Sequence, residues 1–188
     1  MIIPYKGKHP TIGNNVFIAP TAVIIGDVII EDEASIWFGA VVRGDLDRIT
    51  IGAGTNVQDN CMLHVDKDFP LVIGSETTIG HNAVIHGCTI EEHVLIGIGA
   101  TILNSAIIHA GSVVAANSVV PEGMNVGPLQ LAAGVPAKIK KDYGRERLAH
   151  NVADAQIYLD LAKAYRELLS GAHPWMDTRQ QARDKEKR

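Results

Sequence analysis

The most regular feature of the chain is an aliphatic residue at every sixth position, with few interruptions. The repeated positions are Ile12, Ile18, Ile24, Ile30, Ile36 and Val42, then Ile51, Val57 and Leu63, then Ile73, Ile79 and Ile85, then Ile90, Ile96, Ile102, Ile108, Val114, Val120 and Val126. A period of six is not helical, and the enrichment in Ile, Val and Thr favours short strands. Repeating hexapeptides are typical of a parallel β-helix, in which each coil buries its aliphatic residues on the next.

The repeat predicts a mainly β domain over residues 1–135. Three hexapeptides, one for each face of a three-sided prism, make a coil of about 18 residues that rises about 4.8 Å. We therefore expect about six coils between Ile12 and Val126. The repeat does not fix the hand of the coil, because the general rule for parallel crossovers would make it right-handed.

Two interruptions of the repeat predict segments that leave the coil. Val42 and Ile51 are nine residues apart, and Leu63 and Ile73 are ten apart, instead of six. The first interval has three extra residues, so part of it should bulge. The second has four, so the polar segment 65–70 should form a loop outside the coil.

Counting in repeats, rather than in residues, predicts a column of side chains on one face. Val42, Leu63 and Ile85 lie three repeats apart, so they should occupy the same face of successive coils. Strand alternation turns the side chain after each of them outward. The residues in these outward positions are Arg43, His64 and His86.

His81 does not belong to this column, because it follows Ile79 by two positions and falls on the preceding face or at a corner. Five extended residues span roughly 16 Å, so His81 and His86 of one chain are poorly placed to share a metal. Three imidazoles are a common donor set for catalytic zinc, although iron and cobalt also suit them. The sequence therefore predicts a metal site completed between subunits of a cyclic oligomer.

The period becomes helical after the repeat. A Gly-Val-Pro-Ala-Lys segment at residues 134–138 should end the coil and reverse the chain, and a helix should run from about Tyr143 to Ser170. Within the segment 136–170 we expect this helix to pack along the prism. Its two apolar stripes are Leu148, Val152, Ala155, Leu159 and Ala162, and beside them Ile157, Leu161 and Leu168. The polar, basic residues 171–188 are expected to be a loosely ordered tail.

Composition narrows the class of protein. The 188 residues are 46% hydrophobic and 20% charged, which is typical of neither a disordered nor a membrane chain. A net charge of −4 gives no reason to expect nucleic-acid binding. Cys61 and Cys88 form no CxxC pair, and the first residues lack the apolar run of a signal peptide. These features predict a cytoplasmic protein with reduced thiols and no membrane partner.

Each candidate residue also has a structural interpretation. A histidine on a β-helix is often a polar surface residue, and His9, His93, His109, His150 and His173 keep that interpretation. Gln58 and Asp59 could be turn residues, and Arg43 and Asp45 could be a simple surface ion pair. Cys61 and Cys88 are interpreted as packing residues. The glycines serve the corners, because no strand, Gly-rich loop and helix follow one another as in a phosphate-binding loop.

The motifs taken together resemble the γ-class carbonic anhydrases. The matching residues are, in order, Arg43-Gly44-Asp45, the segment Asn56-Val57-Gln58-Asp59-Asn60, and His64, His81 and His86. The resemblance covers nearly the whole chain, and it implies a left-handed β-helix that assembles as a homotrimer. It also implies that His64 and His86 of one subunit and His81 of its neighbour hold the metal.

The resemblance assigns roles to further residues. It implies that Gln58 and Asp59 hydrogen-bond around the metal-bound water, that Arg43 and Asp45 form contacts between subunits, and that Asn56 belongs to the same structural and interface set. A zinc-bound hydroxide would attack carbon dioxide, and water would displace the bicarbonate. The proton would leave through buffer or a nearby group, for which Tyr158 on the helix is a candidate.

The sequence also departs from the archetypal enzyme. Leu46 stands where a glutamate follows the Arg-Gly-Asp-type motif, and the loop 65–70 is short, with only Asp66 and Asp68 acidic. Two alternatives to a carbonic anhydrase therefore stay open. One is a hexapeptide acyltransferase, or a protein of acyl-CoA or carnitine pathways. The other is a catalytically weak, metal-binding assembly subunit.

Overall fold

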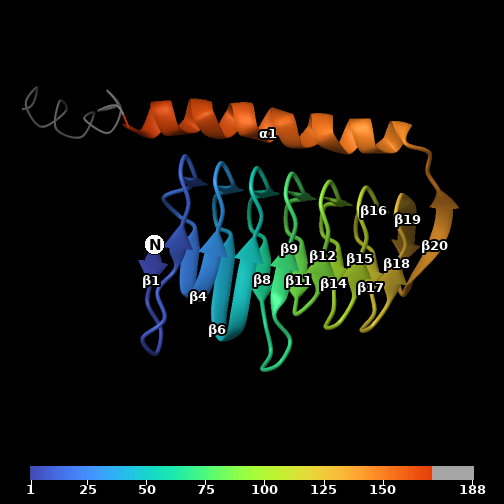
Figure 1. Cartoon of the computed structure of the whole chain (residues 1–188), viewed down its shortest axis with the longest axis horizontal. Helices are drawn as coiled ribbons and strands as arrows, with labels where there is room; N and C mark the ends of the chain where they lie inside the picture. The colour runs from blue at the N-terminus through green and yellow to red at the C-terminus, as the bar shows by residue number, and fades with distance from the viewer. Residues whose placement is uncertain (171–188) are drawn as a thin grey trace, which may run out of the picture.

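The computed structural model describes residues 1–170. It shows a left-handed parallel β-helix of about seven turns, with the helix α1 (Glu146–Ser170) running along one face (Figure 1). The predicted fold class is confirmed. The solenoid is longer than the six coils that the repeat predicts, because β1 (Ile2–Ile3) and β19 (Gln130–Gly134) extend its ladders at the two ends.

The strands line three faces of the prism. The histidine face consists of β1, the first halves of β4 (Val23–Ile30) and β6 (Val41–Ile51), β8 (Met62–His64), β11 (Val84–His86), β14 (Thr101–Ile102) and β17 (Val119–Val120). The third face consists of β2 (Thr11–Ile12), the second halves of β4 and β6, β9 (Leu71–Ile73), β12 (Thr89–Ile90), β15 (Ile107–Ile108) and β18 (Asn125–Val126). The helix face consists of β3 (Phe17–Ile18), β5 (Ser35–Ile36), β7 (Asn56–Val57), β10 (Thr78–Ile79), β13 (Leu95–Ile96), β16 (Val113–Val114) and β19.

The core is a set of aliphatic ladders in which each coil stacks on the next. On the histidine face, one ladder of directly paired and fully buried residues consists of Ile24, Val42, Leu63, Ile85, Ile102 and Val120. Each of these side chains leaves water by packing on its counterpart above and below, which contributes roughly 1.5–3 kcal/mol per residue. The period of six is therefore the period of the core.

Both predicted interruptions leave the coil as expected. The register between β4 and β6 moves from Gly26 opposite Gly44 to Val28 opposite Ile49, so β6 holds three extra residues. The segment 65–70 joins β8 to β9 as a loop that projects from the prism (Figure 1). Because the extra residues are held outside the ladder, the register of the histidines is preserved.

The coil ends where the Gly-Val-Pro-Ala-Lys segment lies. The chain reverses after Gly134, and β20 (Ala137–Asp142) pairs with β19 in antiparallel fashion. The helix α1 then returns along the helix face, in contact with β3, β5, β7 and β10. No helix within residues 1–170 is long and apolar enough to cross a membrane. The predicted tail 171–188 lies outside the described residues.

The helix packs through a narrower seam than its two stripes predict. Ala155 and Ala162 of the first stripe are buried against the prism. The second stripe is exposed, with Ile157 56%, Leu161 39% and Leu168 39% accessible. Aromatic residues take part of its place, because the ring of Tyr165 packs on those of Phe17, Trp37 and Phe38.

Candidate metal centre

The parallel register stacks two of the three predicted ligands. His64 of β8 pairs with Arg43 of β6 on one side and with His86 of β11 on the other, as the repeat count predicts. The two imidazole rings have their centroids 4.9 Å apart, and His64 Nδ1 lies 2.9 Å from His86 Nε2. One nitrogen of each ring therefore faces the same point on the histidine face.

The other nitrogen of each ring faces an oxygen. His64 Nε2 lies 2.9 Å from Asp45 Oδ1, and His86 Nδ1 lies 2.7 Å from Asn104 Oδ1. A carboxylate or amide oxygen only accepts hydrogen bonds, so both of these ring nitrogens carry a proton and donate. In the neutral imidazoles the lone pairs are then on His64 Nδ1 and His86 Nε2, which face each other.

This arrangement fits a divalent metal such as zinc. Two nitrogen lone pairs 2.9 Å apart repel unless a proton or a cation lies between them. An oxygen acceptor behind each ring is also the usual support of a metal-bound histidine. Within residues 1–170 of one chain, no three His, Cys, Asp or Glu side chains gather closely enough to hold an ion. Within one chain the pair therefore supplies two of the three predicted ligands.

Asp45 links this pair to Arg43. The guanidinium of Arg43 donates to Asp45 Oδ2, while His64 is held on Oδ1 of the same carboxylate. Burial acts to raise the pKa of Asp45, but the hydrogen bonds from Arg43 and His64, together with the charge of Arg43, outweigh it and hold the pKa below its usual value. The sequence left open whether Arg43 and Asp45 form an ion pair within one chain, and the structure shows that they do. Contacts of these residues with a neighbouring subunit stay a prediction.

His81 lies on a different corner of the prism, as expected. It follows β10, and its Nδ1 lies 2.9 Å from Asp59 Oδ2. Its Nε2 lies 3.4 Å from the hydroxyl of Tyr158, and its backbone N–H donates to Gln58 Oε1 at 3.1 Å. The imidazole is 37% exposed. The carboxylate of Asp59 and the hydroxyl of Tyr158 thus orient the His81 ring, which remains accessible from outside the chain.

Gln58 and Asn56 lie inside the chain beside the His81 corner. Gln58, which the sequence also allowed as a turn residue, is 5% accessible. Asn56 is fully buried, and its place in an interface between subunits stays a prediction. A chain of hydrogen bonds runs from Thr78 through Asn56 to Gln58, and ends on the backbone of His81. Gln58 thus supports the backbone of the His81 corner.

Tyr158 reaches the corner from α1, as the sequence suggested. Its ring packs edge-on against Trp37, with centroids 5.4 Å apart. Burial, and secondarily the charge of Asp59, raises the pKa of its hydroxyl above the usual value for tyrosine. A largely apolar pocket of about 380 Å³ adjoins it, with His81, Gly97, Ile98 and Ile157 among its lining residues. The neutral hydroxyl of Tyr158 therefore lies between the polar His81 corner and an apolar pocket.

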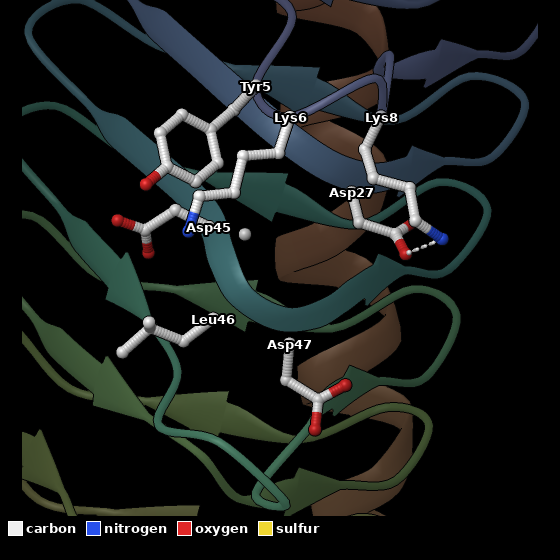
Figure 2. A pocket seen from close by; sticks show the side chains of 8 residues that line it. Tyr5, Lys6, Lys8, Asp27, Asp45, Leu46 and Asp47 are labelled. Carbon is white, nitrogen blue, oxygen red and sulfur yellow. Dashed lines mark ion pairs between the residues drawn. The ribbon is translucent and has the colours of Figure 1, made fainter.

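A second pocket, of about 350 Å³, lies beside Asp45 at the bulge of β6. Figure 2 shows Leu46 across this pocket from Tyr5 and Lys8, with Lys8 turned toward Asp27. Leu46 is 51% exposed and has no group that could carry a proton. The acidic side chain that the archetypal enzyme has at this place is therefore absent from position 46.

Asn104 and Asp66 are site residues that sequence reasoning missed in these roles. Asn104 follows β14 and accepts from His86, and its amide group donates to Asp66 Oδ2 at 2.9 Å. The signal was available, because the coil after His86 has 17 residues, which places Asn104 opposite Gly87, the residue that follows the ligand. An Asn in a corner also fits a turn residue, so the sequence alone does not single it out.

The remaining histidines and cysteines agree with their structural interpretations. His93 faces Glu76 at 3.3 Å and His109 faces Glu91 at 2.9 Å, on corners away from the site. His9 and His150 are exposed, and His173 lies outside the described residues. Cys61 and Cys88 are free thiols, and both are buried. Burial raises the pKa of each thiol to about 12.

Comparison with known proteins agrees with this geometry. The bacterial transferase hexapeptide family (six repeats) matches residues 9–44 and 87–122. The chain is 39% identical over 164 residues to γ carbonic anhydrase 2, a mitochondrial protein of Arabidopsis thaliana, covering 84% of this chain and 59% of that protein. It therefore spans about three fifths of the length of this relative. It is also 39% identical over 168 residues to a carbonic anhydrase of Geobacillus kaustophilus, covering 89% and 92%.

Two further similarities point in other directions. The carnitine operon protein CaiE of Escherichia coli is 35% identical over 173 residues, covering 90% of this chain and 83% of that protein. A crystal structure of a hexapeptide transferase family protein from Anaplasma phagocytophilum is 39% identical, with a TM-score of 0.84, covering 88% of this chain and 98% of that one. Relatives of one fold thus have names from several functional classes.

Proposed function

The chain belongs to the γ-class carbonic anhydrase-like family of hexapeptide-repeat proteins, and on that basis we propose that it catalyses the reversible hydration of carbon dioxide. The metal would be held by His64 and His86 of one subunit and His81 of the next. The observation that carries the proposal is the pair of ring nitrogens on the histidine face, held toward one point by Asp45 and Asn104. Carbon dioxide and bicarbonate are the proposed substrate and product.

The proposed metal is zinc, with iron or cobalt as alternatives that imidazole also binds. When bound by three histidines, zinc supplies hydroxide at neutral pH, because it lowers the pKa of water from 15.7 to about 7. Asp45 and Asn104 keep the ligand nitrogens of His64 and His86 deprotonated. Asp59 plays the same part for His81, because its carboxylate accepts from Nδ1 and leaves the lone pair on Nε2, which lies 3.4 Å from the hydroxyl of Tyr158.

The assembly that we propose is a homotrimer. The exposed side chains beside the histidine column include Met62 and Val84, at 38% and 37% accessible. Those near the His81 corner include Ile98 and Ile157, at 53% and 56% accessible. Apolar surface beside both halves of a divided site favours a contact that brings them together. The same contact repeated head to tail around a threefold axis closes a ring.

Substrate and proton each have a candidate route in this proposal. Carbon dioxide is apolar, and the pocket beside His81 offers an apolar surface next to the corner. The hydroxyl of Tyr158, 3.4 Å from His81 Nε2, is the group that we propose to carry the proton away from the site. Leu46 cannot take that role, so transfer to dissolved buffer should carry much of the proton flux.

Two observations keep a second candidate in view. The match to the bacterial transferase hexapeptide family and the similarity to a transferase structure favour an acyltransferase that uses one histidine as a general base. Such an enzyme would need neither a metal nor His64 and His86 stacked in one column. Metal content measured beside acyl-CoA turnover separates the two. A protein that holds metal but hydrates no carbon dioxide would instead be an assembly subunit.

The cytoplasmic location stays a prediction, and the relatives include mitochondrial proteins.

The test is stopped-flow hydration of carbon dioxide by protein of measured metal content. We expect roughly one metal per chain and turnover well above buffer, both lost in His81→Ala. The matched control is His93→Ala, which removes another corner histidine that faces a glutamate but lies away from the site. Its metal content and rate should equal those of the wild type. Full metal content without hydration would refute the activity while leaving the metal site intact.

A further inference from the structure

Asn104 connects the ligand pair to the loop 65–70. It is half-buried in the coil that follows His86, and its Oδ1 lies 2.7 Å from His86 Nδ1. Its Nδ2 donates to Asp66 Oδ2 at 2.9 Å. A carboxylate can only accept, so it selects the NH₂ group of the amide and leaves the oxygen for the ring. Asp66 therefore fixes the orientation of Asn104, and Asn104 fixes which nitrogen of His86 carries the proton.

The backbone around His86 leaves room for this contact. A Cβ atom at Gly87 would lie 2.4 Å from Asn104 Oδ1 and 3.0 Å from the Cβ of Phe69. Gly87 also has φ of +48°, which glycine adopts readily. Asp66 is held by a tight turn, in which the N–H of Phe69 donates to the Asp66 carbonyl at 3.1 Å. The loop that leaves the coil therefore folds back against the residue that follows the ligand.

A similar corner elsewhere shows which part of this arrangement is special. Asn117 also lies over a glycine of the preceding coil, because a Cβ at Gly99 would be 2.3 Å from Asn117 Oδ1, although Asn117 itself has φ of +55°. Stacking an Asn over a glycine of the preceding coil is thus a feature of the corners. Unlike Asn104, Asn117 has no side-chain hydrogen bond to any partner within residues 1–170. The polar partners on both sides distinguish Asn104.

We propose that Asn104, oriented by Asp66, is a positioning residue for His86, an inference that rests on the metal site proposed above. Asn104 holds the ring in the tautomer whose Nε2 lone pair faces His64, so the loop 65–70 supports the site without touching the metal. Without the acceptor, His86 can take its other tautomer or turn about its ring axis. The proposal thus gives the short loop a function.

The test compares four proteins with the wild type. Asn104→Leu keeps the number and branching of the side-chain heavy atoms and removes the acceptor. Asn117→Leu makes the same change at the matched corner. Asp66→Asn combined with Asn104→Asp exchanges the two groups, so that a carboxylate accepts from both the ring and the amide. His86→Gln assigns the ring signals. Two quantities are measured: the ¹⁵N shifts of the His86 ring in metal-free protein, and the zinc Kd by chelator competition.

We expect Asn104→Leu to lose the Nδ1–H signature of His86 and to bind zinc about 10–100-fold more weakly. The exchanged pair should recover most of both, and Asn117→Leu should match the wild type. The proposal is overturned if Asn104→Leu keeps the wild-type shifts and affinity. It is also overturned if Asn117→Leu loses as much, or if the exchanged pair stays as weak as Asn104→Leu. Failure of the wild type to bind zinc would refute zinc as the metal of the proposed site, and the shifts in metal-free protein would still decide the role of Asn104.

Discussion

The two halves of the candidate site are built in different ways. His64 and His86 come from strands that pair directly, so the spacing of their rings follows from the backbone ladder of the coil. His81 comes from a corner, and it is held by Asp59 and by Tyr158, which lies 77 residues later on α1. The first half is a product of the repeat itself. The second depends on an element outside the repeat.

This difference is the reason that we propose a site shared between chains. Residues on different faces of a rigid prism cannot converge, because the coil cannot bend toward itself without breaking its ladders. A second prism can bring its corner to the face of the first. Substitutions in the two halves should therefore have similar effects on metal binding but different effects on the stability of the chain.

The largest expected effect is the loss of metal from either half. His86→Ala and His81→Ala should each reduce the metal content from roughly one per chain to near zero, because two imidazoles are a weak donor set. Both apoproteins should keep the β-helix, since neither ring is part of the core. Metal analysis after gel filtration, with circular dichroism as the check on folding, measures this. Full occupancy in either variant would remove that histidine from the ligand set.

The next effect should separate orientation from folding at the His81 corner. Asp59→Ala removes the acceptor of His81 Nδ1, so metal affinity or turnover should fall about 10–100-fold. Glu76→Ala, which removes the carboxylate facing His93, is the matched control and should leave both unchanged. Unaltered kinetics and metal content in Asp59→Ala would show that His81 needs no such partner.

Gln58 should behave in the opposite way to Asp59. Gln58→Ala leaves Asn56 Oδ1 and the backbone N–H of His81 without partners in a buried place, which costs about 1–3 kcal/mol. The midpoint of thermal unfolding of the metal-free protein should fall by about 2–4 °C for each kcal/mol. Gln156→Ala, an exposed change on α1, is the control. An unchanged midpoint would mean that water replaces the lost contacts.

The smallest expected signal is the reaction of DTNB with the two buried thiols, Cys61 and Cys88, which lie near the two halves of the candidate site. Cys61 donates to the carbonyl of Gly80 beside the His81 corner, and Cys88 follows Gly87 after the column. Burial raises the pKa of both to about 12, so each stays a neutral thiol up to about that pH. Thiolate is the reactive form, and at pH 8 it amounts to about one part in ten thousand. DTNB should therefore label neither cysteine in the folded protein, and rapid labelling would contradict their burial.

Sequence reasoning could predict the half of the site that obeys the repeat. The positions of Val42, Leu63 and Ile85 in successive coils, and hence the stacking of His64 on His86, follow from counting hexapeptides. The loop 65–70 and the bulge in β6 follow from the same count. These features are local consequences of one period, so the pattern of aliphatic residues contains them.

Contacts between distant elements were harder to predict. The exposure of Ile157 and Leu161 depends on where α1 touches the helix face, which its own periodicity does not specify. The burial of Gln58 depends on the hydrogen bonds around it, and the role of Asn104 depends on a loop 38 residues away. Only the family resemblance implies the left hand of the coil, because the general rule for parallel crossovers would make it right-handed.

The most direct test of the account is complementation between the two halves. His81→Ala and His64→Ala proteins, each free of metal, are dissociated, mixed in equal amounts and allowed to reassemble. In a ring whose sites lie between subunits, random mixing gives about one quarter of the interfaces both intact halves. We predict that about this fraction of wild-type zinc binding and hydration returns. If subunit exchange is confirmed and the mixture stays as free of metal as its parents, the site is not shared between chains.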